Sequence, residues 1–306
     1  MALLAYQRVE PIDWKGKEVM RHSISASTFI RDCFAGAFCV FESMASFLPF
    51  VEDMTVLDLG STDGTLQALR EIAEANPRIK VVESHFARID AASFAIAANE
   101  AVAQWKHPQG LFWYADEIWH EDLLQLMDKD LSDGVRELSF WRYQLRDNFQ
   151  VMSWPPHPIH RVGIREQFTF VDEGTNTNRT WDAKICSNWN GGWFTRWGTD
   201  FGEDYTKLPT NEMVMDVGAI GGFIENIVQK RKMHAPFWHE SPNVRGEPAG
   251  QWYTKERSNP IWTKGDTPYN IPHIMRYHVG KTQYNLRPEL LEALKADETR
   301  SLLGYD

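Results

Sequence analysis

Residues Val56 to Thr65 read VLDLGSTDGT. The first of them are apolar, which is typical of a buried strand, and this strand ends near Asp58. A turn of small residues follows, and the pattern from Leu66 to Ala75 then predicts a helix with one apolar face. A carboxylate at the carboxyl end of a strand, beside such a turn, is where open α/β sheets bind nucleotides.

A second acidic turn lies further along the chain. The apolar run from Leu111 to Tyr114 predicts another strand, and it leads into Asp116 and Glu117. Two acids at strand ends of one sheet would face the same crevice, so we expect Asp116 to lie near Asp58. This arrangement suits a divalent metal ion and a nucleotide diphosphate, because hard oxygen ligands favour Mg²⁺ or Mn²⁺.

Strand and helix patterns alternate around these two acids. Further strands are expected at Val19–Ile24, Ile79–Glu83, Glu137–Tyr143, His160–Ile164 and Met213–Val217, and further helices at Phe29–Phe47, Ala91–Trp105 and Arg287–Leu303, with a polar turn at Ser25–Thr28. The alternation predicts an α/β fold with a mostly parallel, layered sheet flanked by helices. Residues 1–215 are interpreted as one domain, and residues 216–306 as a loop-rich, aromatic C-terminal extension.

Composition narrows the class of protein. The 306 residues carry a formal net charge of −10, which disfavours a surface that wraps duplex nucleic acid. No run of 18 or more apolar residues occurs, so no transmembrane helix is expected, and the first residues do not resemble a signal peptide. The three cysteines lack metal-ligand spacing, and a reducing, cytoplasmic compartment is the expectation.

Tryptophan is unusually frequent. Of the 13 tryptophans, all but Trp14 follow residue 100. Tryptophan faces are good platforms for sugar rings, whereas the simpler interpretation is that they fill the core of the second half. For any single tryptophan we favour packing.

Several common nucleotide and hydrolase motifs are missing. The chain has no phosphate-binding P-loop and no Gly-x-Ser-x-Gly elbow, and the glycines from Gly218 to Gly222 are wrongly spaced for a dinucleotide fingerprint. His120-Glu121 resembles half of a zinc-protease helix, but Leu124 stands where the second histidine is required.

The order of the segments resembles the family-2-like glycosyltransferases of the GT-A fold. Their Asp-x-x-Ser-x-Asp-Gly-Thr pattern is matched from Asp58 to Thr65. A helix, a short strand, a small-residue helix containing Asn99, and the acidic segment from Tyr114 to Glu121 follow in the family's order. The likeness covers residues 20–130 and becomes weaker beyond them.

This resemblance implies an enzyme that moves a hexose or pentose from a nucleotide-diphosphate sugar to a hydroxyl group of a carbohydrate or other acceptor. In the family, the acid matching Asp58 contacts the nucleotide, and Asp116 matches a ligand of a divalent metal, Mn²⁺ or Mg²⁺. The family's metal motif usually has two aspartates, and Tyr114 replaces the first. Glu117 is a candidate for a further ligand of this metal. Each acid also has a purely structural interpretation. Asp58 would cap the turn that follows it, and Asp116 and Glu117 would form an exposed acidic turn at the start of a helix.

Further site residues follow from the same resemblance. Relatives often place a third metal ligand late in the catalytic domain, and the candidates here are Asp216, His234, His239 and His278, with Asp216 and His278 preferred.

An inverting displacement needs a carboxylate that deprotonates the acceptor, and Glu203-Asp204 resembles the element that supplies it. Ser25 and Arg88 are candidates for contacts with the nucleoside or phosphate. For Asp63, a helix cap is the commoner role.

Three rival functions stay open at this point. The first is a binding protein for nucleotide sugars or carbohydrates that has lost catalysis, which the missing aspartate at Tyr114 favours. The second is a glycosyltransferase whose acceptor is a modified base in nucleic acid. The third, a nucleotidyltransferase, requires a basic glycine-rich loop near the first strand that the sequence lacks.

Overall fold

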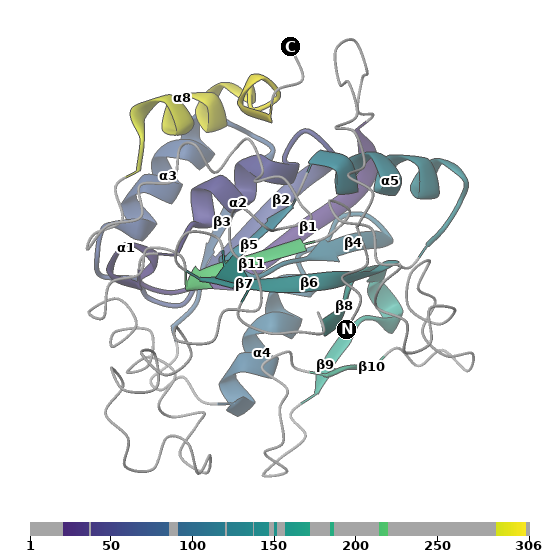
Figure 1. The fold of residues 1–306 in the computed structure, drawn as a ribbon. Coiled ribbons are helices and arrows are strands. Elements are labelled where there is room, and N and C mark those ends of the chain that lie inside the picture. Colours follow the sequence, from purple (N-terminus) through teal and green to yellow (C-terminus); the bar gives the residue numbers. More distant parts are fainter. Residues whose placement is uncertain are drawn as a thin grey trace, which may run out of the picture.

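The fold is seen in a computed structural model that describes residues 21–36, 38–85, 91–119, 121–136, 138–146, 150–151, 157–171, 184–186, 214–219 and 286–303. A mixed sheet of nine strands forms its centre (Figure 1). These strands are β1 (His22–Ile30), β2 (Val51–Asp58), β3 (Ile79–Glu83), β4 (Gln109–Phe112), β5 (Glu117–Trp119), β6 (Leu138–Arg146), β7 (Gln150–Val151), β8 (His157–Ile164) and β11 (Val214–Ala219). A separate ribbon pairs β9 (Thr169–Val171) with β10 (Lys184–Cys186).

The strand order is β3-β2-β1-β4-β8-β6-β11-β5, and β7 pairs with β6. The first four strands in this order are parallel to one another. Beyond them, β8 runs antiparallel to both β4 and β6, while β11 is parallel to β6 and antiparallel to β5. The predicted α/β class is confirmed, with the parallel part formed by the first half of the chain.

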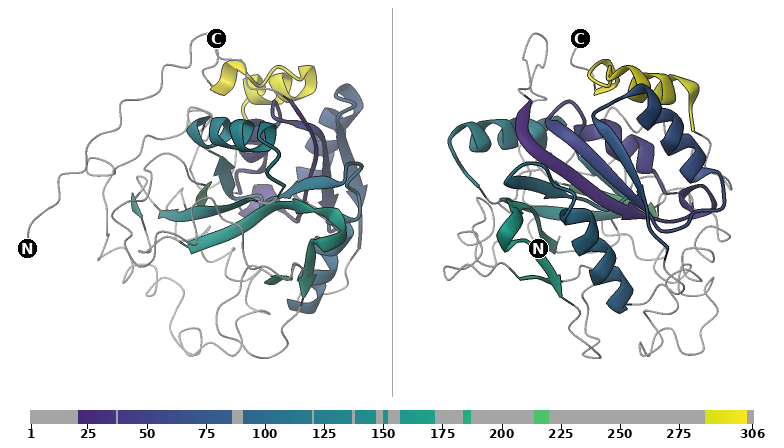
Figure 2. Two further views of the ribbon diagram at one scale, coloured as in Figure 1. Left: turned by 90° about the vertical axis from the view of Figure 1, so that its right-hand side faces the viewer. Right: turned by 180° about the vertical axis from the view of Figure 1, so that it is seen from behind.

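Helices cover both faces of the sheet. They are α1 (Cys33–Gly36), α2 (Val40–Phe47), α3 (Thr65–Ala75), α4 (Ala91–Val102), α5 (Glu121–Ser132) and α8 (Pro288–Ala296), with short 3-10 turns at Arg165–Gln167 and Ser301–Leu303. Helices α2, α3, α5 and α8 share one hydrophobic core, and α4 covers the other face with a second core (Figure 2). Alternate residues of β1 and β2 supply the two cores, as the period of a strand requires.

Local patterns predicted several elements correctly. Helix α3 and strand β3 lie where the sequence places them, and α4 begins at the expected residue. Trp105, Trp113 and Trp119 are fully buried, so packing is confirmed for these three tryptophans.

The expected turn at Ser25–Thr28 is wrong, because these residues continue β1 between β2 and β4. Their polar groups are satisfied inside the sheet layers: Trp105 Nε1, for example, donates to Ser27 Oγ at 2.7 Å. The helix expected at Phe29–Phe47 therefore begins later, as α1 and α2.

The C-terminal helix packs on the first half of the chain. Helix α8 contacts α2 and α3, and Leu290 and Leu294 are fully buried in the same core. Strand β11, which crosses residue 215, lies inside the main sheet. The division of the chain at residue 215 stays a prediction.

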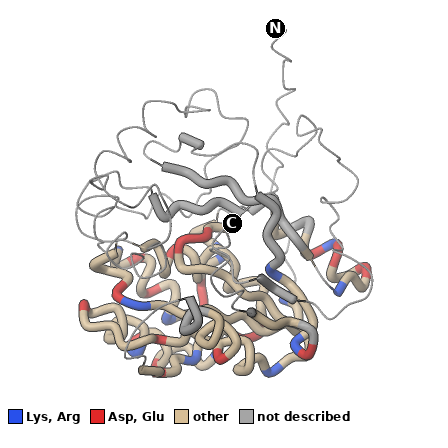
Figure 3. The backbone as a smooth tube through the Cα atoms, turned by 90° about the horizontal axis from the view of Figure 1, so that it is seen from below, with Lys and Arg blue, Asp and Glu red and all other residues tan. Residues whose placement is uncertain are grey.

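Basic residues do not form a continuous run over the described part of the chain, where they lie singly among acidic ones (Figure 3). Among the described residues, no helix is both long and apolar enough to cross a membrane.

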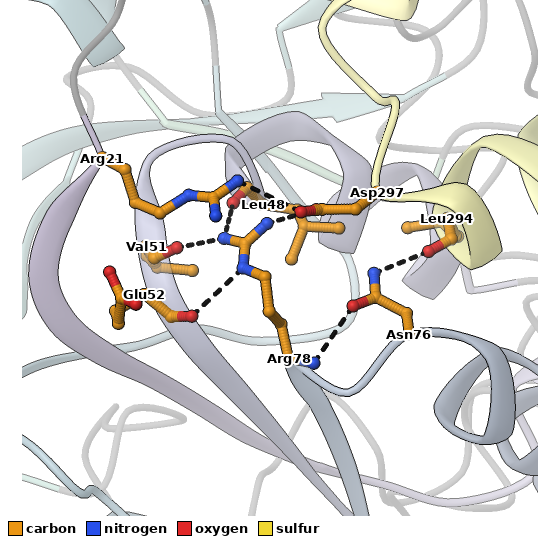
Figure 4. A network of polar contacts seen from close by, with 8 residues as sticks. All are labelled: Arg21, Leu48, Val51, Glu52, Asn76, Arg78, Leu294 and Asp297. Atoms are coloured by element: carbon orange, nitrogen blue, oxygen red, sulfur yellow. Dashed lines mark hydrogen bonds and ion pairs between the residues drawn. The ribbon is translucent and has the colours of Figure 1, made fainter.

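Arg78 joins α8 to the start of β2 (Figure 4). Its guanidinium group donates to the carbonyl oxygens of Leu48 at 2.7 Å, Glu52 at 3.1 Å and Val51, and it pairs with Asp297. Burial lowers the pKa of Arg78, while the charge of Asp297 acts in the opposite direction. Nearby, Asn76 Nδ2 donates to the carbonyl oxygen of Leu294 at 2.8 Å.

Replacing Arg78 with Met is expected to lower the free energy of unfolding by about 3 kcal/mol, because several carbonyl oxygens and Asp297 lose a charged donor together. Denaturant titration measures the change. The matched control is Arg70→Met, whose pair with Glu83 at 2.5 Å is half-exposed and should contribute no more than about 0.5 kcal/mol. Equal effects of the two changes would contradict the role of the Arg78 network.

Candidate functional site

The carboxyl ends of β1 and β2 lie side by side. Ile30 pairs with Asp58 in the sheet, and Leu59 N donates to the carbonyl oxygen of Ile30 at 2.9 Å. The loop after β1 and the turn after β2 therefore start at the same height, at the edge where a parallel sheet binds ligands.

Hydrogen bonds join these two loops into what we call the clasp, formed by residues 32–35 and 61–65. The backbone N–H of Asp32 donates to Ser61 Oγ at 2.8 Å, and Thr62 N donates back to Asp32 Oδ1 at 2.7 Å. Asp32 adopts a left-handed conformation with φ of 48°, which an aspartate tolerates better than most residues. The two loops thus hold each other in place.

Asp63 and Thr65 complete the clasp. Asp63 Oδ1 accepts from Thr65 N at 3.0 Å at the start of α3, and its Oδ2 accepts from Ala35 N at 2.7 Å. Phe34 N donates to Thr65 Oγ1 at 3.1 Å. The N-cap of α3 is Gly64, with φ of 99°, so Asp63 stands one residue before the cap and accepts only the N–H of the first helical residue.

Asp58 is fully buried at the end of β2. Its Oδ1 accepts hydrogen bonds from Gly60 N at 2.9 Å and Ser61 N at 2.8 Å, so the turn-capping interpretation is correct for one oxygen. Its Oδ2 is also buried but has no hydrogen-bond partner among the described residues. Such a carboxylate oxygen can accept a donor from a ligand.

Glu117 is taken up by a buried ion pair and is not available as the metal ligand that its sequence position suggests. Arg161 of β8 donates to Glu117 Oε1 at 2.5 Å and to Oε2 at 2.9 Å. The two side chains are 1% and 0% exposed. A carboxylate paired through both oxygens with a guanidinium group is a poor ligand for a second cation.

Burial raises the pKa of the Cys33 thiol well above its ordinary value. The charges of four aspartates around the thiol act in the same direction: Asp63, Asp58, Asp116 and Asp32. Strand β4, which leads to Asp116, is parallel to β1, so its carboxyl end lies at the same edge of the sheet as the end of β2 at Asp58. That the two acids meet in one site stays a prediction.

The described residues do not make a complete metal site, since no group of three potential ligands occurs among them. Asp116 is partly exposed at the edge. The register of β11 and β5 places the backbone of Asp216 opposite Glu117, one residue from Asp116. The strand that carries Asp216 thus runs beside the acidic turn.

Ser25 lies elsewhere. It is fully buried in the amino-terminal half of β1, where its hydroxyl group donates to Asp53 at 3.2 Å and accepts from Lys106 N and His107 N. The structure does not bring it to the edge with Asp58. The other predicted site residues lie outside the described part of the chain: Arg88, Glu203, Asp204, His234, His239 and His278.

Two edge residues were missed at the sequence level. Arg31 follows β1 directly, its side chain is 36% exposed, and its Nε lies 3.5 Å from Asp32 Oδ2. His85 is exposed after β3, and its Nδ1 lies 3.4 Å from where a Cβ on Gly60 would be. His85 follows the strand predicted at Ile79–Glu83, and this position is the signal that could have identified it. Arg31 lies within the helix expected at Phe29–Phe47, so the predicted elements gave no such signal for it.

No protein-family model and no curated protein matches the chain. Three solved structures of S. aureus TarS are similar in structure. The first is 14% identical over 50% of this chain and 31% of that chain, with a TM-score of 0.34. The structure of TarS 1-349 in complex with UDP is 14% identical over 50% of this chain and 51% of that chain, with a TM-score of 0.35. A further structure of TarS 1-349 is 11% identical over 92% of this chain and 90% of that chain, with a TM-score of 0.40. At these TM-scores the likeness carries no argument.

Replacing Cys33 with Ala is expected to change how stability depends on pH. A raised native pKa means that the folded protein keeps the thiol proton while the unfolded chain releases it. Below an unfolded pKa of about 8.5 the difference between wild type and variant is constant. Above it, wild type loses up to about 1.4 kcal/mol per pH unit relative to Cys33→Ala, until the native pKa is reached.

Denaturant unfolding of both proteins between pH 7 and 10 measures this difference, and titrations common to both proteins cancel. Parallel pH profiles would show that the Cys33 thiol does not lie in an acidic, buried environment.

Proposed function

We propose that the chain is a glycosyltransferase that moves a sugar from a nucleotide-diphosphate sugar to an acceptor hydroxyl group. The observation that carries the proposal is the buried Asp58 Oδ2, which lacks a hydrogen-bond partner among the described residues at the edge where Asp116 also lies. A fixed acceptor suits a donor group of a base or ribose, and a second acid suits a diphosphate when a divalent cation lies between them.

The donor would lie across the clasp. Asp58 Oδ2 would accept a hydrogen bond from the base or the ribose, while its Oδ1 stays with the turn. Gly60, with φ of 90°, gives the turn a conformation that other residues rarely adopt, and the His85 ring lies next to it. The Arg31 guanidinium group and the His85 imidazole would lie beside the phosphates, together with Arg88.

A divalent metal, Mn²⁺ or Mg²⁺, belongs to the proposal through Asp116. Asp216 and His278 are the candidates for further ligands, and β11, which carries Asp216, runs beside the strand that follows Asp116. When bound, such a metal neutralises the charge that develops on the leaving diphosphate. Glu117 is excluded from this ligand set by its pair with Arg161.

The reaction would be a direct displacement with inversion. The acceptor oxygen forms a bond to the anomeric carbon as the bond from that carbon to the diphosphate oxygen breaks. The acceptor proton passes to Glu203 or Asp204, and the electron pair leaves with the diphosphate.

A binding protein without catalysis is the second candidate, and one observation favours it. Tyr114 stands in place of the first acid of the metal motif, and Arg161 pairs with Glu117, so two of the carboxylates that a metal would need in this turn are missing. This alternative predicts nucleotide-sugar binding with no loss of the sugar from the donor.

The first test measures the melting temperature with a panel of nucleotide-diphosphate sugars, with and without Mn²⁺, together with donor hydrolysis. One donor should raise the melting temperature, since a ligand at 100 times its Kd stabilises the native state by about 2.7 kcal/mol. Asp58→Asn should abolish this shift. Asp116→Asn should abolish the Mn²⁺-dependent part of the shift in melting temperature. It should also abolish hydrolysis of the donor.

Asp53→Asn is the matched control. Asp53 is also buried in β2, and its Oδ1 likewise lacks a hydrogen-bond partner among the described residues, but it lies at the amino-terminal end of the strand. This variant should keep the donor-induced shift. A shift that survives Asp58→Asn, or the absence of any shift in folded wild type, would contradict the proposal, and binding without hydrolysis would favour the second candidate.

A further inference from the structure

The acidic turn that carries Asp116 is held by a buried ion pair. Arg161 and Glu117 form a fully buried ion pair between β8 and β5, strands that are not neighbours in the sheet order. We infer that Arg161 is a positioning residue that acts through Glu117 to fix Asp116 at the edge. This inference rests on the proposed function, because it assigns Asp116 its role there.

Arg161 reaches both sides of the turn. Besides its two bonds to Glu117, its Cζ lies 4.8 Å from the centre of the Tyr114 ring, at the distance of a cation–π contact. Glu117 Oε2 in turn accepts a hydrogen bond from Tyr114 N at 3.2 Å. One guanidinium group thereby holds the residue before and the residue after the Ala115-Asp116 pair.

The backbone of the turn is closed as well. Glu117 N donates to the carbonyl oxygen of Tyr114 at 2.9 Å, and Ser43 Oγ of α2 donates to the carbonyl oxygen of Glu117 at 2.5 Å. Cys39 Sγ lies 3.8 Å from the carbonyl oxygen of Ala115. Asp116 is partly exposed, and it lies in the turn between Tyr114 and Glu117, which these contacts hold in place.

The chemistry of the pair explains why positioning is a more specific role than stability. Two charges buried together gain little over apolar residues of similar volume, because desolvation offsets their attraction. Their forked geometry, however, fixes orientation in a way that apolar contacts do not. Removing both charges should therefore leave a folded protein with a loosened turn, whereas removing only one would leave a buried charge unpaired.

The test uses the full chain and three variants. Arg161→Met/Glu117→Met removes both charges, and Arg161→Lys keeps the charge but loses the fork. Arg78→Met is the control, since it is expected to destabilise the protein through the α8 contacts and leaves Arg161 and Glu117 unchanged. For each protein the readouts are the melting temperature, hydrogen exchange of the amides of Tyr114 and Glu117, and kcat and KM for the donor identified with wild type.

The double variant should fold. Its amides at Tyr114 and Glu117 should exchange faster than those of Arg78→Met when each protein is measured the same number of degrees below its own melting temperature. Its kcat should fall about 10-fold to 100-fold, because a displacement of about 1 Å in a reacting group has that effect. Its KM for the donor should stay within about 3-fold, since Asp58 is unchanged. Arg161→Lys should lie between wild type and the double variant.

Wild-type kcat in a folded double variant would overturn the inference, as would an equal loss of kcat in Arg78→Met. Unchanged exchange at Tyr114 and Glu117 would overturn it independently of catalysis. A wild type that neither binds nor hydrolyses any donor would instead refute the proposed function, and the exchange result would still decide whether the pair holds the turn.

Discussion

The candidate site depends on the clasp between the loop after β1 and the turn after β2. Parallel strands end at one edge with unpaired backbone groups, and here side chains of the opposite loop satisfy them. Each such bond contributes about 1 kcal/mol, so their main effect is to give both loops a single conformation. Without this constraint Asp58 would have no fixed turn to cap, and its second oxygen would have no defined direction.

Polar groups at the edge are divided between structure and ligand. Asp32 and Asp63 have protein partners for the oxygens that form the clasp, and Glu117 is neutralised by Arg161. Asp58 is used on one side only. Several acids can therefore lie around the buried Cys33, because hydrogen-bond donors or a guanidinium group stabilise the negative charge of most of them. Few of these carboxylates require a cation from a ligand.

Local patterns predicted what is determined locally. The strand ending at Asp58, the start of α3 and the bond from Thr65 N to Asp63 all depend on residues close together in sequence. The partner of Glu117 could not be predicted, because Arg161 lies on a distant strand and sequence spacing does not reveal such pairing. The same reason explains the error at Ser25–Thr28, whose polar side chains indicated a turn until their buried partners were known.

The most direct test of the account is a crystal structure of the protein with the donor nucleotide bound. The base or ribose should lie within hydrogen-bond distance of Asp58 Oδ2, with the diphosphate extending toward Asp116. Nucleotide density at the opposite end of the sheet, beside Asp53 and His107, would contradict it. So would density at the clasp in which Asp58 Oδ2 touches no donor of the ligand.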